Sequence, residues 1–224
     1  MPRVKNAPRG YRGVAMEGLI AARYAKTTLP DIEEYRSLAK TIAARVRPGA
    51  KVLEVAPGPG HTAIELARLG SFKVTGMDIS ATFVEMGRRN AREAGVAVDF
   101  GQGDAASMPF PDDTFDFVVC RAAFKSFAQP LCALLEMHRV LKRPGAALIV
   151  DLKPDVTPQV IDDYISRGHR RGASAVFLKW KFLQCLRRAA HSREEFESLI
   201  ARTGFSGYEI REEPMDYMVW LFKE

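Results

Sequence analysis

The sequence contains few cysteines, and their spacing does not suit a shared site. Cys120, Cys132 and Cys185 form no C-x-x-C pair and are odd in number, which argues against a zinc ribbon and against a disulfide framework. Sparse cysteine of this kind favours a reducing compartment. We therefore expect a cytoplasmic protein without a metal site.

Long apolar runs are also missing. The first residues are basic, but the apolar stretch over residues 14–22 is interrupted by Glu17, so it does not form the core of a signal peptide. No apolar run approaches the roughly 20 residues needed to cross a bilayer. The sequence thus predicts no membrane-spanning segment and leaves open a transient contact with a membrane surface.

The composition is that of a globular protein with an excess of basic residues. The 224 residues are 47% apolar and 27% charged, which excludes collagen, coiled coil and disordered tails. At roughly 150 residues to a domain, this length predicts one compact domain with an appendage. The formal net charge of +6 is compatible with an anionic partner such as RNA, a membrane surface or an acidic metabolite, and decides among none of them.

Apolar strand patterns alternate with helical patterns through the middle of the chain. This alternation predicts a parallel sheet wrapped by helices. The near-continuous apolar segments 117–120 and 147–150 fit a sheet that is covered on both faces. The expected strands are residues 51–55, 72–77, 96–100, 113–120 and 146–151, and the expected helices are 31–46, 61–69, 81–94 and 130–141.

The two ends of the chain differ from this alternating core, residues 31–151. Residues 1–30 are rich in Arg, Gly, Ala and Pro, which predicts an irregular or short-helical arm. In the C-terminal part, 152–224, residues 157–190 have a helical pattern of mixed apolar and basic side chains. Ser192 and Glu195 form a capping-box pattern that opens another helix. Two short β-like runs, 207–211 and 217–222, end the chain.

A glycine turn flanked by acids gives the strongest functional signal. The segment from Glu54 to Gly60 ends the first strand, and Asp78 ends the second. Such a turn lets a ligand approach the backbone, while the second acid binds ribose hydroxyls. The diphosphate of a dinucleotide binds at the start of the following helix, because that end favours negative charge. The carboxylate of Glu54 would repel a diphosphate bound there. It suits a cationic ligand instead.

These residues resemble the class I S-adenosylmethionine-dependent methyltransferases, in particular the ubiquinone/menaquinone-type small-molecule branch. The resemblance covers roughly residues 31–151, and in it Ala56 stands where a glycine is usual. Residues 139–145 look like the Arg-Val-Leu-Lys-Pro-Gly element that precedes the fifth strand of the family. By resemblance, the cofactor S-adenosylmethionine would contact Glu54, Ala56, Gly58, Gly60, Asp78, Ile79, Asp104, Ala105, Cys120 and Arg121.

The resemblance also implies a fold and an activity. The fold is a Rossmann-like α/β sheet of seven mostly parallel strands, with helices on both faces and an antiparallel last strand. Residues 1–30 and 157–190 would then cover the substrate. The activity is in-line transfer of a methyl group to a small-molecule acceptor. If the acceptor must lose a proton, His61, Asp151 and Tyr24 are the candidate catalytic residues.

Three other interpretations remain open from the residues alone. An NAD(P)-linked Rossmann reductase of the short-chain type would carry a Tyr-x-x-x-Lys pair, and no tyrosine here has a lysine four residues later. An RNA methyltransferase is suggested by the net charge and the basic segment 165–188, but residues 119–123 match no nucleic-acid methyltransferase motif, so we expect no nucleic-acid partner. The same basic segment could lie on a membrane surface and present a lipid-like substrate.

Overall fold

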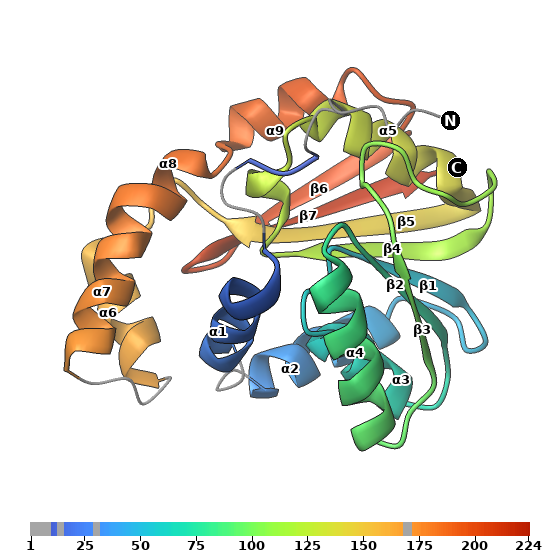
Figure 1. The fold of residues 1–224 in the computed structure, drawn as a ribbon. Helices are drawn as coiled ribbons and strands as arrows, with labels where there is room; N and C mark the ends of the chain where they lie inside the picture. The colour runs from blue at the N-terminus through green and yellow to red at the C-terminus, as the bar shows by residue number, and fades with distance from the viewer. Residues whose placement is uncertain (1–9, 13–15, 29–31, 168–171) are drawn as a thin grey trace, which may run out of the picture.

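The chain folds into one sheet with helices on both faces (Figure 1). The computed structural model describes residues 10–12, 16–28, 32–167 and 172–224. A 3₁₀ turn at Phe124–Ser126 follows β4, and a π-helical turn at Phe182–Leu186 joins α7 to α8. The helices are α1 (Gly18–Thr28), α2 (Ile32–Ala43), α3 (His61–Arg68), α4 (Ala81–Glu93), α5 (Pro130–Val140), α6 (Pro158–Arg167), α7 (Ala173–Lys181), α8 (Arg187–Ala189) and α9 (Arg193–Ile200).

The sheet has the strand order β3-β2-β1-β4-β5-β7-β6. Strands β1 to β5 are parallel to one another, whereas β7 runs antiparallel to β5 and to β6. The predicted fold class is therefore confirmed, including the antiparallel last strand. The strands are β1 (Lys51–Val55), β2 (Lys73–Asp78), β3 (Val98–Gln102), β4 (Phe115–Arg121), β5 (Leu141–Leu152), β6 (Gly207–Glu212) and β7 (Asp216–Lys223).

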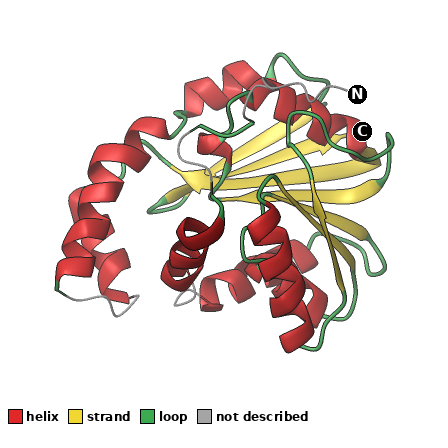
Figure 2. Cartoon of the chain, viewed as in Figure 1, coloured by secondary structure: helices red, strands yellow, loops and turns green. Residues whose placement is uncertain are grey.

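Each face of the sheet carries its own apolar core, because neighbouring strand residues point to opposite faces. Val52 and Phe117 pack with α2, α3 and α4 on one face. Leu53 and Val118 pack with α5 and α9 on the other. Figure 2 shows the resulting three layers, with the yellow sheet between two groups of red helices. Burial on both faces explains why these strands are apolar throughout rather than alternating.

Some element boundaries differ from the sequence-based expectation. β3 begins at Val98 rather than Val96, because the amide of Val96 donates to the carbonyl of Ala91 and still belongs to the end of α4. β5 begins at Leu141, directly after α5, so Pro144 and Gly145 lie inside the strand instead of before it. The pairing of β5 with β4 shifts register at this point.

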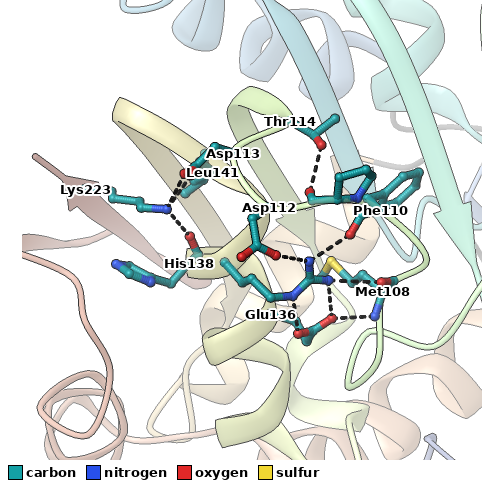
Figure 3. A network of polar contacts seen from close by, with 11 residues as sticks. Met108, Phe110, Asp112, Asp113, Thr114, Glu136, His138, Leu141 and Lys223 are labelled. Carbon is teal, nitrogen blue, oxygen red and sulfur yellow. Dashed lines mark hydrogen bonds and ion pairs between the residues drawn. The ribbon is translucent and has the colours of Figure 1, made fainter.

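Arg139 fixes the loop that precedes β4. Its guanidinium donates to the carbonyl of Phe110 at 2.7 Å and pairs with Asp112 and Glu136 at 2.7 Å each. Glu136 in turn accepts from the amide of Met108 at 2.6 Å (Figure 3). The Arg-Val-Leu-Lys element thus ties this loop to α5 and has a structural role.

Helices α6 to α8 form an insertion with a small core of its own. Leu152, Val156, Ile161 and Ile165 are buried together, beside the main sheet (Figure 1). The helical pattern expected over residues 157–190 is found in the described part of that range. Within the described residues, every helix is too short or too polar to cross a membrane.

Candidate active site

A cavity of about 970 Å³ opens at the carboxyl edge of the parallel strands. This edge is where open α/β sheets bind ligands, since the strands end there and the helices begin. The cavity has two sides that differ in chemistry. The turn side is formed by Glu54, Ala56, Gly58, Asp78, Ile79, Asp104 and Ala105. The insertion side is formed by Tyr164, Leu178, Phe182, Leu186, Met215, Asp216 and Met218.

The turn after β1 keeps the backbone open to the cavity. Ala56, Gly58 and Gly60 all have positive φ, at 55°, 56° and 86°. Nothing lies within 4 Å of the place that a Cβ of Gly58 would take, so a ligand can approach the backbone there. A Cβ at Gly60 would come within 2.6 Å of the ring of Phe100. Gly58 therefore faces the cavity, whereas Gly60 allows the turn to pack on β3.

Glu54 belongs to β1, and its buried carboxylate lies against the first turn of α3. Its carboxylate accepts from the amide of Ala63 at 2.7 Å. Burial raises the pKa of Glu54 to about 7, although this hydrogen bond and the charge of Arg121 act in the opposite direction. A cation bound beside Glu54 would favour the ionised form. The position thus suits a positively charged ligand.

Asp78 and Asp104 supply two further acids on the turn side. Asp78 accepts from the amides of Gly58 and Ser80, both at 2.9 Å, and burial raises its pKa. These bonds tie the glycine turn to the end of β2. Asp104 accepts from the amide of Ala106 at 2.9 Å. Each carboxylate keeps lone pairs for further donors such as sugar hydroxyls or an amino group.

The N-terminal arm lies over the turn side. Tyr11 forms a β-bridge with Phe127, and a Cβ at Gly10 would overlap the carboxylate of Asp104. Further along the arm, Glu17 accepts from the amides of Ala81 and Thr82 at 3.0 Å each and so caps α4. Gly10, Tyr11 and Glu17 thus line the cavity from the part of the arm that the structure describes; residues 1–9, 13–15 and 29–30 lie outside that part.

Two ion pairs lie between the turn side and the insertion side of the cavity. Arg121, at the end of β4, pairs with Glu34 at 2.8 Å and stacks on the ring of Tyr35 at 4.3 Å. Lys125 pairs with Asp151 at 2.6 Å, and both side chains are buried. Burial opposes the charge of Lys125, but the Asp151 carboxylate outweighs it and raises the pKa of the amine. Both cations are thus already neutralised by the protein.

The structure brings most of the expected site residues together. All of the expected cofactor contacts except Gly60 and Cys120 line the cavity, and so does Tyr24 from α1. Cys120 is fully buried with its side chain toward α5 and α9, while its neighbour Arg121 reaches the cavity. Burial raises the pKa of the Tyr24 hydroxyl, so at neutral pH it is a hydrogen-bond donor rather than a base.

The other two candidate catalytic residues do not line this cavity. Asp151 lies behind Lys125 and accepts from the amides of Lys125 and Leu152, at 2.6 and 2.8 Å. His61 packs on the ring of Tyr35 at 5.0 Å between centroids and lines a separate small pocket between α1 and α4. Asp151 lies near the end of β5 and His61 at the start of α3, and neither is among the residues that line the cavity.

Three cavity residues were missed by sequence reasoning. Glu17 was noted only as an interruption of an apolar stretch, and no local signal shows that it caps a helix that begins 64 residues later. Tyr35 lies within the expected helix 31–46 but was not singled out as a site residue, and it lines the cavity. Asp216 begins β7, and no motif marks it.

Comparison with known proteins agrees with this geometry. Residues 53–149 match the family described as methyltransferase domain. The chain is 38% identical over 128 residues to the uncharacterized methyltransferase YcgJ of Bacillus subtilis, which is 57% of this chain and 50% of that protein. It is 36% identical over 132 residues to the ubiquinone/menaquinone biosynthesis C-methyltransferase UbiE of Cellvibrio japonicus, which is 56% of this chain and 53% of the relative. The chain thus spans about half the length of these relatives.

Solved structures show the same fold. A protein from Methanococcus maripaludis superposes with a TM-score of 0.76 at 20% identity, covering 95% of both chains. A methyltransferase from Aquifex aeolicus superposes with a TM-score of 0.62 at 18% identity, covering 86% of this chain and 98% of the other. The reductase and RNA-modifying alternatives are not favoured by these matches. Residues 53–149 thus match a methyltransferase domain, and proteins of the ubiquinone/menaquinone type are among the relatives that the chain resembles in sequence.

Proposed function

We propose that this protein transfers a methyl group from S-adenosylmethionine to a small-molecule acceptor held on the insertion side of the cavity. The observation that carries the proposal is the pair of buried acids, Glu54 and Asp78, beside an open glycine turn. A cation with a ribose satisfies both acids, whereas a diphosphate would meet the Glu54 charge.

The cavity is large enough for a donor and an acceptor together. Single-ligand pockets usually enclose about 300–1,000 Å³, and this cavity lies near the top of that range. When bound, S-adenosylmethionine supplies an electrophilic methyl group, which an acceptor nucleophile takes as the sulfonium becomes a thioether. The protein's own task is to align the two molecules and exclude water.

Each side chain then has a defined part in that task. Glu54 and Asp78 hold the donor, and the arm around Gly10 closes over it. Tyr24 lies on the cavity wall, where its protonated hydroxyl orients the acceptor by donating a hydrogen bond. Asp151 acts through Lys125, as a positioning residue. We place this activity in the cytoplasm, because the scarcity of cysteine favours a reducing compartment.

Calorimetric titration with S-adenosylhomocysteine tests the proposal. We expect binding to the wild-type protein and an affinity at least about tenfold lower in Asp78→Asn, because a hydrogen bond to a charged group contributes roughly 1.5–3 kcal/mol. Asp99→Asn is the matched control, since Asp99 is exposed on β3 and lies outside the cavity. Absence of binding, or tighter binding of NADH than of S-adenosylhomocysteine, would disprove the proposed function.

A further inference from the structure

Asp216 lies at the ligand-binding edge because β7 runs antiparallel. It is the first residue of β7 and pairs with Leu152, the last residue of β5. The start of an antiparallel strand meets the carboxyl ends of its parallel neighbours. Asp216 therefore stands beside the cavity and lines it, although it is not at the carboxyl end of a strand.

The Asp216 carboxylate has no hydrogen-bond or ion-pair partner among the described residues, in contrast to the side chains of Arg121 and Lys125. Arg121 is engaged by Glu34, and Lys125 by Asp151. With those two pairs neutral, Asp216 adds one uncompensated negative charge to the insertion side. Arg167 also lines the cavity, at the exposed end of α6, where its side chain donates to the carbonyl of Asp163 at 3.4 Å. An anionic ligand beside Asp216 would thus meet a carboxylate.

Apolar side chains form part of the surroundings of Asp216. Tyr164, Leu178, Phe182 and Met215 line the same side of the cavity. Burial raises the pKa of Asp216 to about 6, and the nearby charge of Asp151 adds to this effect while Arg121 and Lys125 reduce it. A carboxylate in such surroundings is costly unless a donor satisfies it. A ligand that brings a donor supplies what the folded chain does not.

We propose that Asp216 binds the methyl acceptor through a hydroxyl or amine on an otherwise apolar molecule, so that the site selects hydrogen-bond donors and cations over carboxylates and phosphates. This inference rests on the proposed function, since it concerns the acceptor of that same reaction. It assigns Asp216 as a specificity-determining residue. It also separates the tasks of the two sides: the turn side binds the donor, and the insertion side chooses the acceptor.

Three matched probes test the selection. A naphthol, a naphthylmethylamine and a naphthoate, substituted at the same ring position, are titrated calorimetrically near pH 7.5 into protein saturated with S-adenosylhomocysteine. We expect the naphthol and the amine to bind at least about tenfold more tightly than the naphthoate. Asp216→Asn should remove the preference for the amine, whereas Glu212→Gln should leave it unchanged, because Glu212 is an exposed residue of the same hairpin, paired with Lys153.

The outcomes separate this inference from the proposed function. Failure to bind S-adenosylhomocysteine would refute the function itself. Normal S-adenosylhomocysteine binding together with tighter binding of the naphthoate, binding of none of the probes, or a preference for the amine that persists in Asp216→Asn would overturn the role of Asp216 alone.

If Asp216→Asn fails to fold, a pH series on the wild-type protein tests the same role of Asp216. Amine binding should strengthen from about pH 5 to about pH 7.5, as Asp216 ionises. Glu54 lines the same cavity and has a pKa of about 7, so the series is repeated in Glu54→Gln, where the strengthening should persist if it comes from Asp216. Amine binding that stays constant would count against the proposal.

Discussion

The affinity for S-adenosylhomocysteine is expected to depend on pH through Glu54. This ligand retains an ammonium group, which the ionised carboxylate attracts and the protonated carboxyl does not. In the ligand-free protein the pKa of Glu54 is about 7 instead of 4.5, because the side chain is buried. If only the ionised form of Glu54 binds the ligand, protonation lowers the apparent affinity by the factor 1 + 10^(pKa − pH), in which pKa is that of Glu54. Binding should thus be about tenfold weaker at pH 6 than at pH 8.

The same shift has an opposite effect on the stability of the ligand-free protein. Because the folded-state pKa lies above the unfolded one, the folded protein binds more protons between about pH 4.5 and pH 7. Its stability therefore falls as pH rises through this window, by roughly 3 kcal/mol at most. Glu54→Gln should raise the stability near pH 8 and weaken binding at the same time.

Calorimetric titrations near pH 6, 7 and 8 check both effects when combined with thermal unfolding. Glu54→Gln should bind weakly with little dependence on pH across this range. Glu93→Gln is the control, since Glu93 is exposed at the end of α4 and should behave like the wild-type protein. A wild-type affinity that is constant between pH 6 and pH 8, or a full pH dependence retained in Glu54→Gln, would refute the assignment of the cation to Glu54.

Three further substitutions probe the surrounding structure. Ala56→Gly should stabilise the protein by about 1 kcal/mol in chemical denaturation, because φ is 55° there and a glycine adopts this conformation without strain; a loss of stability would contradict this. Lys125→Met should destabilise it by about 3–5 kcal/mol near pH 7, since it leaves Asp151 buried and unpaired; an unchanged melting temperature would show that the pair is solvated. Gly10→Val should lower the calorimetric affinity for S-adenosylhomocysteine severalfold, because the new side chain overlaps Asp104 and displaces the arm; an unchanged affinity would show that the arm does not cover the donor.

The core of the fold could be predicted because its signals are local. Strands such as β1 and β4 are short apolar runs that end at a glycine turn or at a charged residue, and their bounds agree with the expectation to within two residues. The capping box at Ser192 is likewise a local hydrogen-bond pattern, and both of its bonds are present. β5 was harder to predict, because Pro144 and Gly145 are turn residues, which the strand accommodates where its pairing with β4 shifts register.

The sequence predicted which site residues lie at strand ends, but not the direction in which their side chains point. The end of a strand can be read from hydropathy, but which face its last side chain takes depends on a single residue of register. Cys120 and Arg121 are neighbours, yet one lies in the core and the other at the cavity. Asp151 shows a second limit, since nothing in its own segment indicates that Lys125 will approach it and neutralise it.

Asp216 illustrates why the acceptor is harder to infer than the donor. The turn side is built from consecutive strand ends within the range 53–149, which matches the methyltransferase domain family. The insertion side comes from α6, α7 and the start of β7, which lie outside that range and come together only through the antiparallel return of the chain. Substitutions there can change the acceptor without disturbing Glu54 or Asp78. Similarity over the matched range therefore supports the methyl donor, and the identity of the acceptor must be sought in the residues that face Asp216.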